Sequence, residues 1–318
     1  MTVGDLYDRA VDGERRALGR LLSLVEAGGP DAEAVAELTH AHHDAHVVGI
    51  TGAPGSGKST LTGRLVAQLS EAGRRPAVLA VDPSSPLTGG AILGDRIRMD
   101  DVVGNGVFIR SMATRGHSGG LAVAVPGALR LFAAAGFDPV IVETVGVGQV
   151  EVDVAGTADT TVVVVTPGAG DAVQANKAGL LEVADLFVVN KADRPGAADI
   201  RRDLELMLDL SHLSGLDEAI GRRPPIVMAT ALDGTGADDV AEQIDLHLEW
   251  LRATDRLEER RAGRLRQEVR VRLQQLVDDD LDALLAGSIA APLLAEVATG
   301  ALSPASAARA LRAQLQSR

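Results

Sequence analysis

The chain has 318 residues, 46% of them hydrophobic and 24% charged, a composition typical of a folded protein. A net charge of −13 and only 2% aromatic residues argue against nucleic-acid binding, which needs phosphate neutralisation and stacking surfaces. The absence of cysteine excludes disulfides, thiolate nucleophiles and Cys-ligated metals. Because the N-terminus lacks a signal-peptide pattern and no apolar run is long enough for a membrane span, we expect a soluble cytoplasmic protein.

Taken in chain order, residues 1–45 are predicted to be helical, with a break at residues 28–30 and a second helix from about residue 31. From residue 46 the pattern changes to short runs rich in Val and Ile, which alternate with longer amphipathic stretches. The predicted strands are 47–51, 77–82, 107–111, 139–144, 160–167, 186–191 and 225–230. The predicted helices between them are 58–73, 120–136, 171–184, 197–211 and 237–252. The strands are apolar almost throughout, as in strands buried on both faces of a parallel sheet.

This order predicts an α/β fold with a mostly parallel central sheet flanked by helices. After residue 252 the strand pattern stops, and a long charged helix over 253–285 is followed by short helices near 291–299 and 304–316. We therefore expect an N-terminal helical arm over 1–45, an α/β domain over 46–252 and a C-terminal helical arm over 253–318. The charged helix of the last arm is interpreted as a packing or dimerisation surface, although a solvated face remains the alternative.

The first predicted strand leads directly into a glycine-rich segment that matches the P-loop pattern G-x-x-x-x-G-K-[ST] and opens a helix. Backbone N–H groups of such a loop surround phosphate oxygens, and the helix N-terminus adds partial positive charge. Lys58 would reach the β- and γ-phosphates, and the Ser59 hydroxyl would bind Mg²⁺. The predicted phosphate-side residues are Gly52, Ala53, Pro54, Gly55, Ser56, Gly57, Lys58, Ser59 and Thr60.

A second motif, Asn190-Lys191-Ala192-Asp193, follows the strand predicted over 186–191. The Asp193 carboxylate can accept hydrogen bonds from N1–H and the 2-amino group of guanine, whereas adenine presents neither donor there. Lys191 can pack over the base, and Asn190 can join this loop to the P-loop. Thr230, Ala231 and Leu232 end the last strand, where GTPases place a small-residue loop over the guanine 6-oxo group; a simple turn is the alternative.

Glu143 ends a buried strand and is followed three residues later by Gly146, where most P-loop GTPases have Asp-x-x-Gly. We expect Glu143 to hold Mg²⁺ and Gly146 to offer its N–H to the γ-phosphate. Val147 occupies the position of a water-orienting glutamine, and Gln149 lies two residues further. Either Gln149 reaches the water by another loop path, or hydrolysis is slow until a partner binds; Val147 favours the second reading.

Asp82 ends a strand and Asp95 opens a helix, so both carboxylates are candidates for the Mg²⁺ shell, with capping of a turn or helix as the alternative. The chain keeps lysine at only three of its 31 basic positions, 58, 177 and 191. Lys177 follows the glycine-rich segment 167–171, which suggests a mobile segment that senses the nucleotide, although a turn and cap is the alternative.

Four histidines, His40, His42, His43 and His46, precede the first predicted strand. His42 and His46 would be one helical turn apart, a spacing compatible with a metal site. Solvated polar residues at a helix end are the favoured interpretation.

Together the segments GAPGSGKSTL, AVDPSS, TGGAILGDRIRM, VETVGVGQ, PGAGDAVQANK and VNKAD resemble the MeaB/MMAA family, also called ArgK, over nearly the whole chain. These GTPases chaperone adenosylcobalamin-dependent methylmalonyl-CoA mutase. The resemblance implies a homodimeric enzyme that binds GTP or GDP with Mg²⁺, gates cofactor delivery to the mutase, protects or reactivates it, and is linked indirectly to an adenosyltransferase. It implies Asp82, Asp95 and Glu143 as metal-site carboxylates and Lys177 as a switch lysine.

Two other functions stay open at this point. A nickel metallochaperone GTPase would share the fold, but that class usually carries Cys or Cys/His ligands, which this chain lacks. A non-catalytic adaptor that changes shape with GTP is the other alternative, and the absence of glutamine at position 147 favours it. The sequence does not identify which acyl-CoA mutase would be the client.

Overall fold

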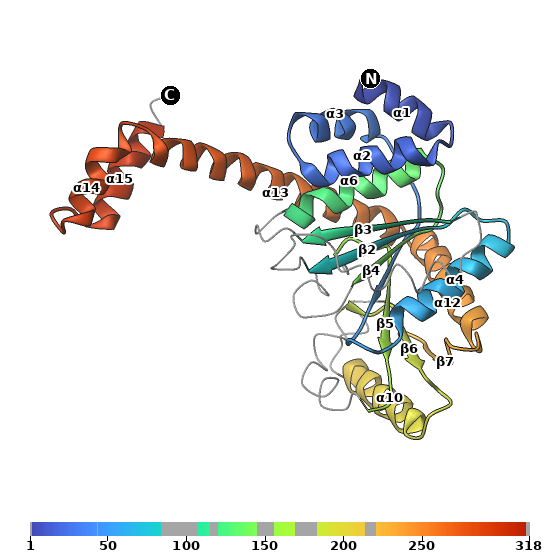
Figure 1. Cartoon of the computed structure of the whole chain (residues 1–318). Helices are drawn as coiled ribbons and strands as arrows, with labels where there is room; N and C mark the ends of the chain where they lie inside the picture. The colour runs from blue at the N-terminus through green and yellow to red at the C-terminus, as the bar shows by residue number, and fades with distance from the viewer. Residues whose placement is uncertain are drawn as a thin grey trace. The chain divides into compact units, whose positions relative to one another are not determined.

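The structure, a computed structural model, describes residues 2–42, 44–83, 107–114, 120–144, 156–168, 183–213 and 221–315. Contacts between residues divide the chain into two units, Met1–Leu265 and Arg266–Arg318. The first unit holds both the N-terminal helices and the sheet (Figure 1). The division into two helical arms and a nucleotide-binding domain, which concerns function, stays a prediction.

Seven parallel strands form the sheet, in the order β3-β2-β4-β1-β5-β6-β7. Their bounds are β1 Val47–Thr51, β2 Ala77–Pro83, β3 Phe108–Thr114, β4 Val140–Thr144, β5 Thr160–Val165, β6 Leu186–Asn190 and β7 Ile226–Ala229. All seven predicted strands and the α/β fold class are therefore confirmed. β1 lies at the centre, so its C-terminal end opens between β4 and β5, where ligands bind in sheets of this kind.

Helices cover both faces of this sheet (Figure 1). In the first unit they are α1 Val3–Val11, α2 Arg15–Ala27, α3 Pro30–Thr39, α4 Lys58–Glu71, α6 Gly120–Ala134, α10 Ala197–Leu213 and α12 Ala237–Ala253. α13 Arg256–Ala286 begins in the first unit and ends in the second, which also contains α14 Ala290–Ala298 and α15 Pro304–Leu315. The helix predicted over 171–184 lies almost wholly outside the described residues.

Strand side chains alternate between two apolar layers, as the two-residue period of a strand requires. On one face, Leu79 and Val81 pack with residues of α1, α2, α3 and α6. On the other, Val78 and Ile50 pack with residues of α4 and α12. The N-terminal helices therefore share the core of the sheet.

The N-terminal segment has one more helix than its sequence predicted. The first predicted helix is interrupted at residues 12–14, where Gly13 has φ of +95° and separates α1 from α2. The interruption lets Leu6 and Leu21, on different helices, both reach the core. Near the other end, Asp255 adopts φ of +59° between α12 and α13, so the predicted long helix begins at Arg256.

No single helix among the described residues is long and apolar enough to cross a membrane. α13 and α14, which meet at a 75° bend, reach that length and composition only when taken together.

Candidate nucleotide-binding site

The P-loop lies between the C-terminal end of β1 and the first residue of α4. Lys58 is 6% exposed, and its Nζ donates to the carbonyl oxygens of Gly52 at 2.6 Å and Ala53 at 3.1 Å. The ammonium is therefore held across the mouth of the loop. Ser56 is fully buried, whereas Pro54, Gly55 and Thr60 are exposed.

Two glycines of this loop are required by close approach as well as by backbone conformation. Gly52 has φ of +141°, and a Cβ there would lie 2.1 Å from the carbonyl oxygen of Val164 in β5. Gly57 has φ of +92°, and a Cβ there would lie 2.3 Å from Nδ2 of Asn190. Any other residue would displace the strand at one position and the Asn190 amide at the other. The pattern of glycines therefore encodes how the loop packs on β5 and β6.

Asn190, at the end of β6, joins three segments that are far apart in the sequence. Its Nδ2 donates to the carbonyl of Ser56 at 2.8 Å, and its Oδ1 accepts from the N–H of Lys191 at 2.8 Å and of Ala231 at 3.0 Å. The side chain is 2% exposed, so these bonds are made away from bulk water. One buried amide thus holds the P-loop, the Asn-Lys-x-Asp segment and the loop after β7 in register.

Lys191 and Asp193 flank the space beside this junction. Lys191 has φ of +58°, an uncommon conformation for a residue with a side chain, and its Nζ donates to the Gly55 carbonyl at 2.7 Å. Its alkyl stem therefore lies across the gap between the two motifs. Asp193 is exposed, so its carboxylate is accessible to a ligand. Leu232, in the loop after β7, is 81% exposed.

The candidate magnesium ligands are partly described. The Ser59 hydroxyl donates to Oε1 of Glu143 at 2.6 Å, and Glu143, in β4, is 1% exposed. A hydroxyl and a carboxylate side by side at the P-loop form the oxygen donor set that Mg²⁺ prefers, so these two residues fit the ion. Asp82 lies in β2, next to β4, but its side chain is not described.

Four predicted site residues, Asp95, Gly146, Gln149 and Lys177, lie outside the described residues. Among the residues that are described, no group of three His, Asp or Glu side chains is placed to hold a metal ion. The interpretation of the histidines as solvated is wrong for His46, which is 1% exposed and donates to or accepts from Thr160 Oγ1 at 2.9 Å. His42 and His46 are not one helical turn apart, because α3 ends at Thr39.

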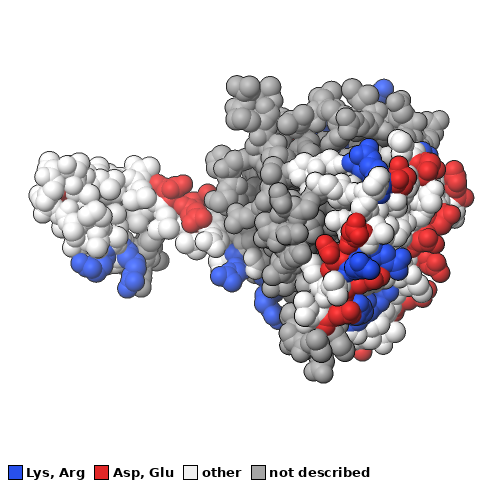
Figure 2. All heavy atoms as spheres, turned by 90° about the horizontal axis from the view of Figure 1, so that it is seen from below, with Lys and Arg blue, Asp and Glu red and all other residues white. Residues whose placement is uncertain are grey.

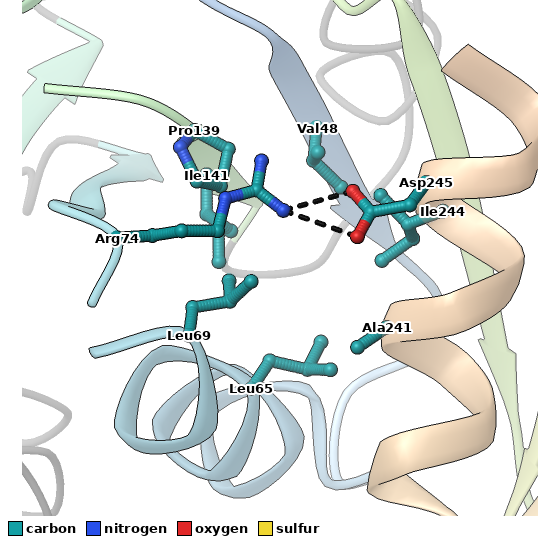
Figure 3. A pocket seen from close by; sticks show the side chains of 9 residues that line it. All are labelled: Val48, Leu65, Leu69, Arg74, Pro139, Ile141, Ala241, Ile244 and Asp245. Atoms are coloured by element: carbon teal, nitrogen blue, oxygen red, sulfur yellow. Dashed lines mark hydrogen bonds and ion pairs between the residues drawn. The ribbon is translucent and has the colours of Figure 1, made fainter. Parts of the chain in front are cut away.

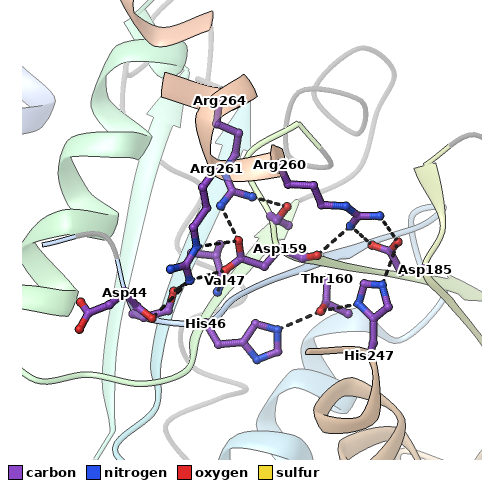
Figure 4. Close-up of polar contacts among 12 residues, drawn as sticks. Asp44, His46, Val47, Asp159, Thr160, Asp185, His247, Arg260, Arg261 and Arg264 are labelled. Atoms are coloured by element: carbon purple, nitrogen blue, oxygen red, sulfur yellow. Dashed lines mark hydrogen bonds and ion pairs between the residues drawn. The ribbon is translucent and has the colours of Figure 1, made fainter. Parts of the chain in front are cut away.

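Sequence reasoning missed a second polar cluster, at the N-terminal ends of the strands (Figure 4). Asp159 accepts from the Val47 N–H at 2.9 Å and pairs with Arg264 and Arg261 of α13. Asp185 pairs with Arg260 at 2.8 Å, and His247 of α12 lies 3.3 Å from it. The only sequence signal was an Asp directly before each of two strands.

These pairs keep both carboxylates ionised. Burial alone would raise the pKa of Asp159, but Arg264 and Arg261 outweigh burial and leave that pKa below its ordinary value. Burial likewise opposes the hydrogen bonds from His247 and Arg260, which lower the pKa of Asp185 to about 2. The cluster therefore holds the start of α13 against the N-terminal ends of β5 and β6, at the opposite end of the strands from the P-loop.

The first unit also has a small cavity and a charged surface, and neither indicates a ligand. A cavity of about 10 Å³ between α4 and α12 is lined by apolar side chains and closed by the Arg74–Asp245 pair, whose Nη1 and Oδ1 are 2.8 Å apart (Figure 3). It has room for roughly one water molecule, so it is a packing space and not a nucleotide pocket. In Figure 2, acidic and basic side chains intermingle over the described surface of this unit.

Comparison with known proteins identifies the family. The model of the family described as methylmalonyl Co-A mutase-associated GTPase MeaB matches residues 18–288. The chain belongs to the MeaB family. A protein of Pyrococcus horikoshii that is named as a GTPase is 46% identical over 285 residues, which cover 89% of each chain.

Two further relatives extend this assignment. A crystal structure titled LAO/AO transport system kinase is 29% identical, has a TM-score of 0.68 and covers 99% of this chain and 97% of its own. The fused isobutyryl-CoA mutase of Cupriavidus metallidurans is 41% identical over 203 residues, which are 62% of this chain and 18% of that protein. The resemblance expected from the motifs is thus confirmed at the level of the family, and with it a GTPase fold and function.

Proposed function

We propose that this MeaB-family protein is a GTP-hydrolysing chaperone that gates cofactor loading of a cobalamin-dependent acyl-CoA mutase and protects or reactivates it. The observation that carries the guanine-nucleotide part is the Asn190 junction, which places the base-reading motif against the P-loop. Support for the mutase part comes from the relative in which a homologous segment belongs to an isobutyryl-CoA mutase. An adenosyltransferase would take part only indirectly, as the supplier of the cofactor.

In this mechanism Asp193 selects guanine and Lys191 packs over its base. Lys58 leaves the carbonyls of Gly52 and Ala53 and donates to the β- and γ-phosphates instead, so its ammonium follows the charge that develops on transfer. Ser59 and Glu143 would hold Mg²⁺, which supplies positive charge to the phosphate oxygens. Asp82 and Asp95 are proposed to complete that shell, and Gly146 to donate its N–H to the γ-phosphate.

Competition binding tests the assignment of the base. Asp193→Asn replaces an acceptor of two guanine donors with an amide, so GTP affinity should fall by about 3 kcal/mol, roughly a hundredfold. Xanthosine triphosphate, whose 2-oxo group suits an amide donor, should bind the variant better than it binds the wild type. Equal binding of ATP and GTP by the wild-type protein would reject guanine selectivity.

Single-turnover hydrolysis with and without a purified acyl-CoA mutase tests the role of the partner. Acceleration by the mutase is expected, because Val147 stands where a water-orienting glutamine would be. A protein that binds GTP and the mutase but never hydrolyses GTP would instead be a nucleotide-dependent adaptor. Methylmalonyl- and isobutyryl-type mutases should be compared as clients in the same assay.

We also propose that α13 is the dimerisation element. Along this 31-residue helix, large apolar side chains that recur at spacings of three or four residues are 39–65% exposed. They are Leu265, Val269, Leu273, Leu276, Val277, Leu281 and Leu285. Seven exposed apolar residues on a helix that is also rich in charged residues suit the matching helix of a second copy. Sedimentation should give a dimer for the wild type and a monomer for Leu273→Glu; a monomeric wild type would refute this role.

A further inference from the structure

Arg64, on α4, lies six residues after Lys58 and reaches the loop that follows β7. Its Nε donates to the carbonyl of Ala231 at 3.2 Å, and its Nη2 donates to the carbonyl of Leu232 at 2.6 Å. The side chain is half-buried. Its guanidinium therefore bonds two consecutive peptide groups of the loop that is expected over the base. Arg64 lies on the same helix as Lys58, the proposed phosphate-binding lysine.

The rest of this loop is closed by its own backbone bonds. The N–H groups of Asp233 and Gly234 donate to the Thr230 carbonyl at 3.2 and 3.0 Å, and the Thr230 N–H donates to the Thr235 carbonyl at 2.9 Å. These bonds fix the base of the turn and leave the carbonyls of its tip to Arg64. Among the described side chains, Arg64 is the one that holds the carbonyls of the tip.

A peptide group is planar and trans, so its N–H points opposite to its carbonyl. When Arg64 holds the Ala231 carbonyl toward α4, the N–H of Leu232 in the same peptide must point away from α4. The Ala231 N–H is already engaged by Asn190 Oδ1. In the described chain the Leu232 N–H has no hydrogen-bond acceptor of its own, and the residue is 81% exposed. It is an exposed donor that is available to a ligand.

We propose that Arg64 is a positioning residue for guanine specificity, which directs the Leu232 N–H toward the 6-oxo group of the bound base. The inference rests on the proposed binding of guanine nucleotides. A fixed N–H donates to the 6-oxo oxygen of guanine and opposes the 6-amino group of adenine, which is itself a donor. Arginine suits this role better than lysine because its rigid fork spans two carbonyls at once.

Calorimetric titration with GDP and with 6-thio-GDP tests this role. The thio analogue keeps the edge read by Asp193 but replaces the 6-oxo oxygen with sulfur, a weak acceptor. The wild type should prefer GDP. In Arg64→Gln, GDP affinity should fall about tenfold and 6-thio-GDP affinity should hardly change, so the preference disappears. Arg64→Lys, which can hold one carbonyl, should lie between the two.

Arg74→Gln is the matched control, because Arg74 follows the same helix and pairs with Asp245 away from the P-loop. It should keep the wild-type preference for GDP even if its melting temperature falls. An equal loss of affinity for both nucleotides in both Arg64 variants, or an unchanged preference, would overturn the positioning role while leaving guanine binding intact. A wild type that binds neither nucleotide would overturn the proposed function together with it.

Discussion

His46 should make the folded protein sensitive to mild acid. The ring is 1% exposed, and burial lowers its pKa from 6.5 to about 4, although the carboxylates of Asp159 and Asp138 oppose the shift. Its Nε2 bonds Thr160, and its Nδ1 is buried without a partner among the described residues. A proton on His46 is thus far less favourable in the folded chain than in the unfolded one.

The sign of the effect follows from proton uptake. Above pH 6.5 neither state binds the proton, so His46 has no influence on stability. Between pH 6.5 and 4 the unfolded chain takes up a proton that the folded chain refuses, so stability falls as the pH falls. At ~1.4 kcal/mol per pKa unit, the full loss is about 3 kcal/mol, of which about 2 kcal/mol is reached at pH 5.

Urea unfolding at pH 7.5 and pH 5.0 measures this loss. Replacing the ring in His46→Gln keeps an amide able to bond Thr160 but removes the titration. Between the two pH values the wild type should lose about 2 kcal/mol more than this variant. His40→Gln, which alters an exposed histidine at the end of α3, should behave as the wild type does. Equal pH dependence of the wild type and His46→Gln would refute the reasoning.

Three other perturbations have defined outcomes. Asp159→Asn should lower the free energy of unfolding by about 3 kcal/mol at pH 7.5, because it leaves two arginines of α13 without their buried counter-charge; a loss below ~1 kcal/mol would mean that they find water. Gly57→Ala should abolish GDP binding measured by calorimetry, because its Cβ would displace Asn190, and wild-type affinity would contradict that packing. Phosphate release from GTP should be slow for the protein alone and faster with its client mutase; a fast basal rate indifferent to the mutase would reject the reading of Val147.

The sheet and the P-loop could be predicted because the residue types within each short segment are enough to identify them. Strands buried on both faces are rich in β-branched and apolar residues, so the run of four valines at 162–165 predicts a strand without knowledge of its neighbours. The P-loop likewise depends on where glycine allows unusual backbone angles, and four of its eight positions are fixed by the pattern. The helix interruption at Gly13 was missed although glycine marked it, because a helical period continues on both sides.

The conformation of Asp255 had only a weak signal, because aspartate adopts a positive φ more often than most residues but is also common in exposed helices. The contacts of Arg64 were also not predictable from its surroundings in the sequence, since arginine on an amphipathic helix usually reads as a solvated residue. Its partners lie on a loop 167 and 168 residues away. Only the order of strands, which places β7 beside β6 and the loop after β7 near α4, brings them together.

The two ends of the sheet therefore differ in how they use charge. At the C-terminal ends of the strands, Lys58 and Lys191 bond backbone carbonyls, which they can leave when phosphate or base offers a stronger partner. At the N-terminal ends, Asp159 and Asp185 are paired with arginines of α13, and breaking such pairs leaves a buried charge. Lys58 and Lys191 can therefore exchange partners where a ligand is expected. The arginines of α13 keep their partners, and these ion pairs attach the start of α13 to the sheet.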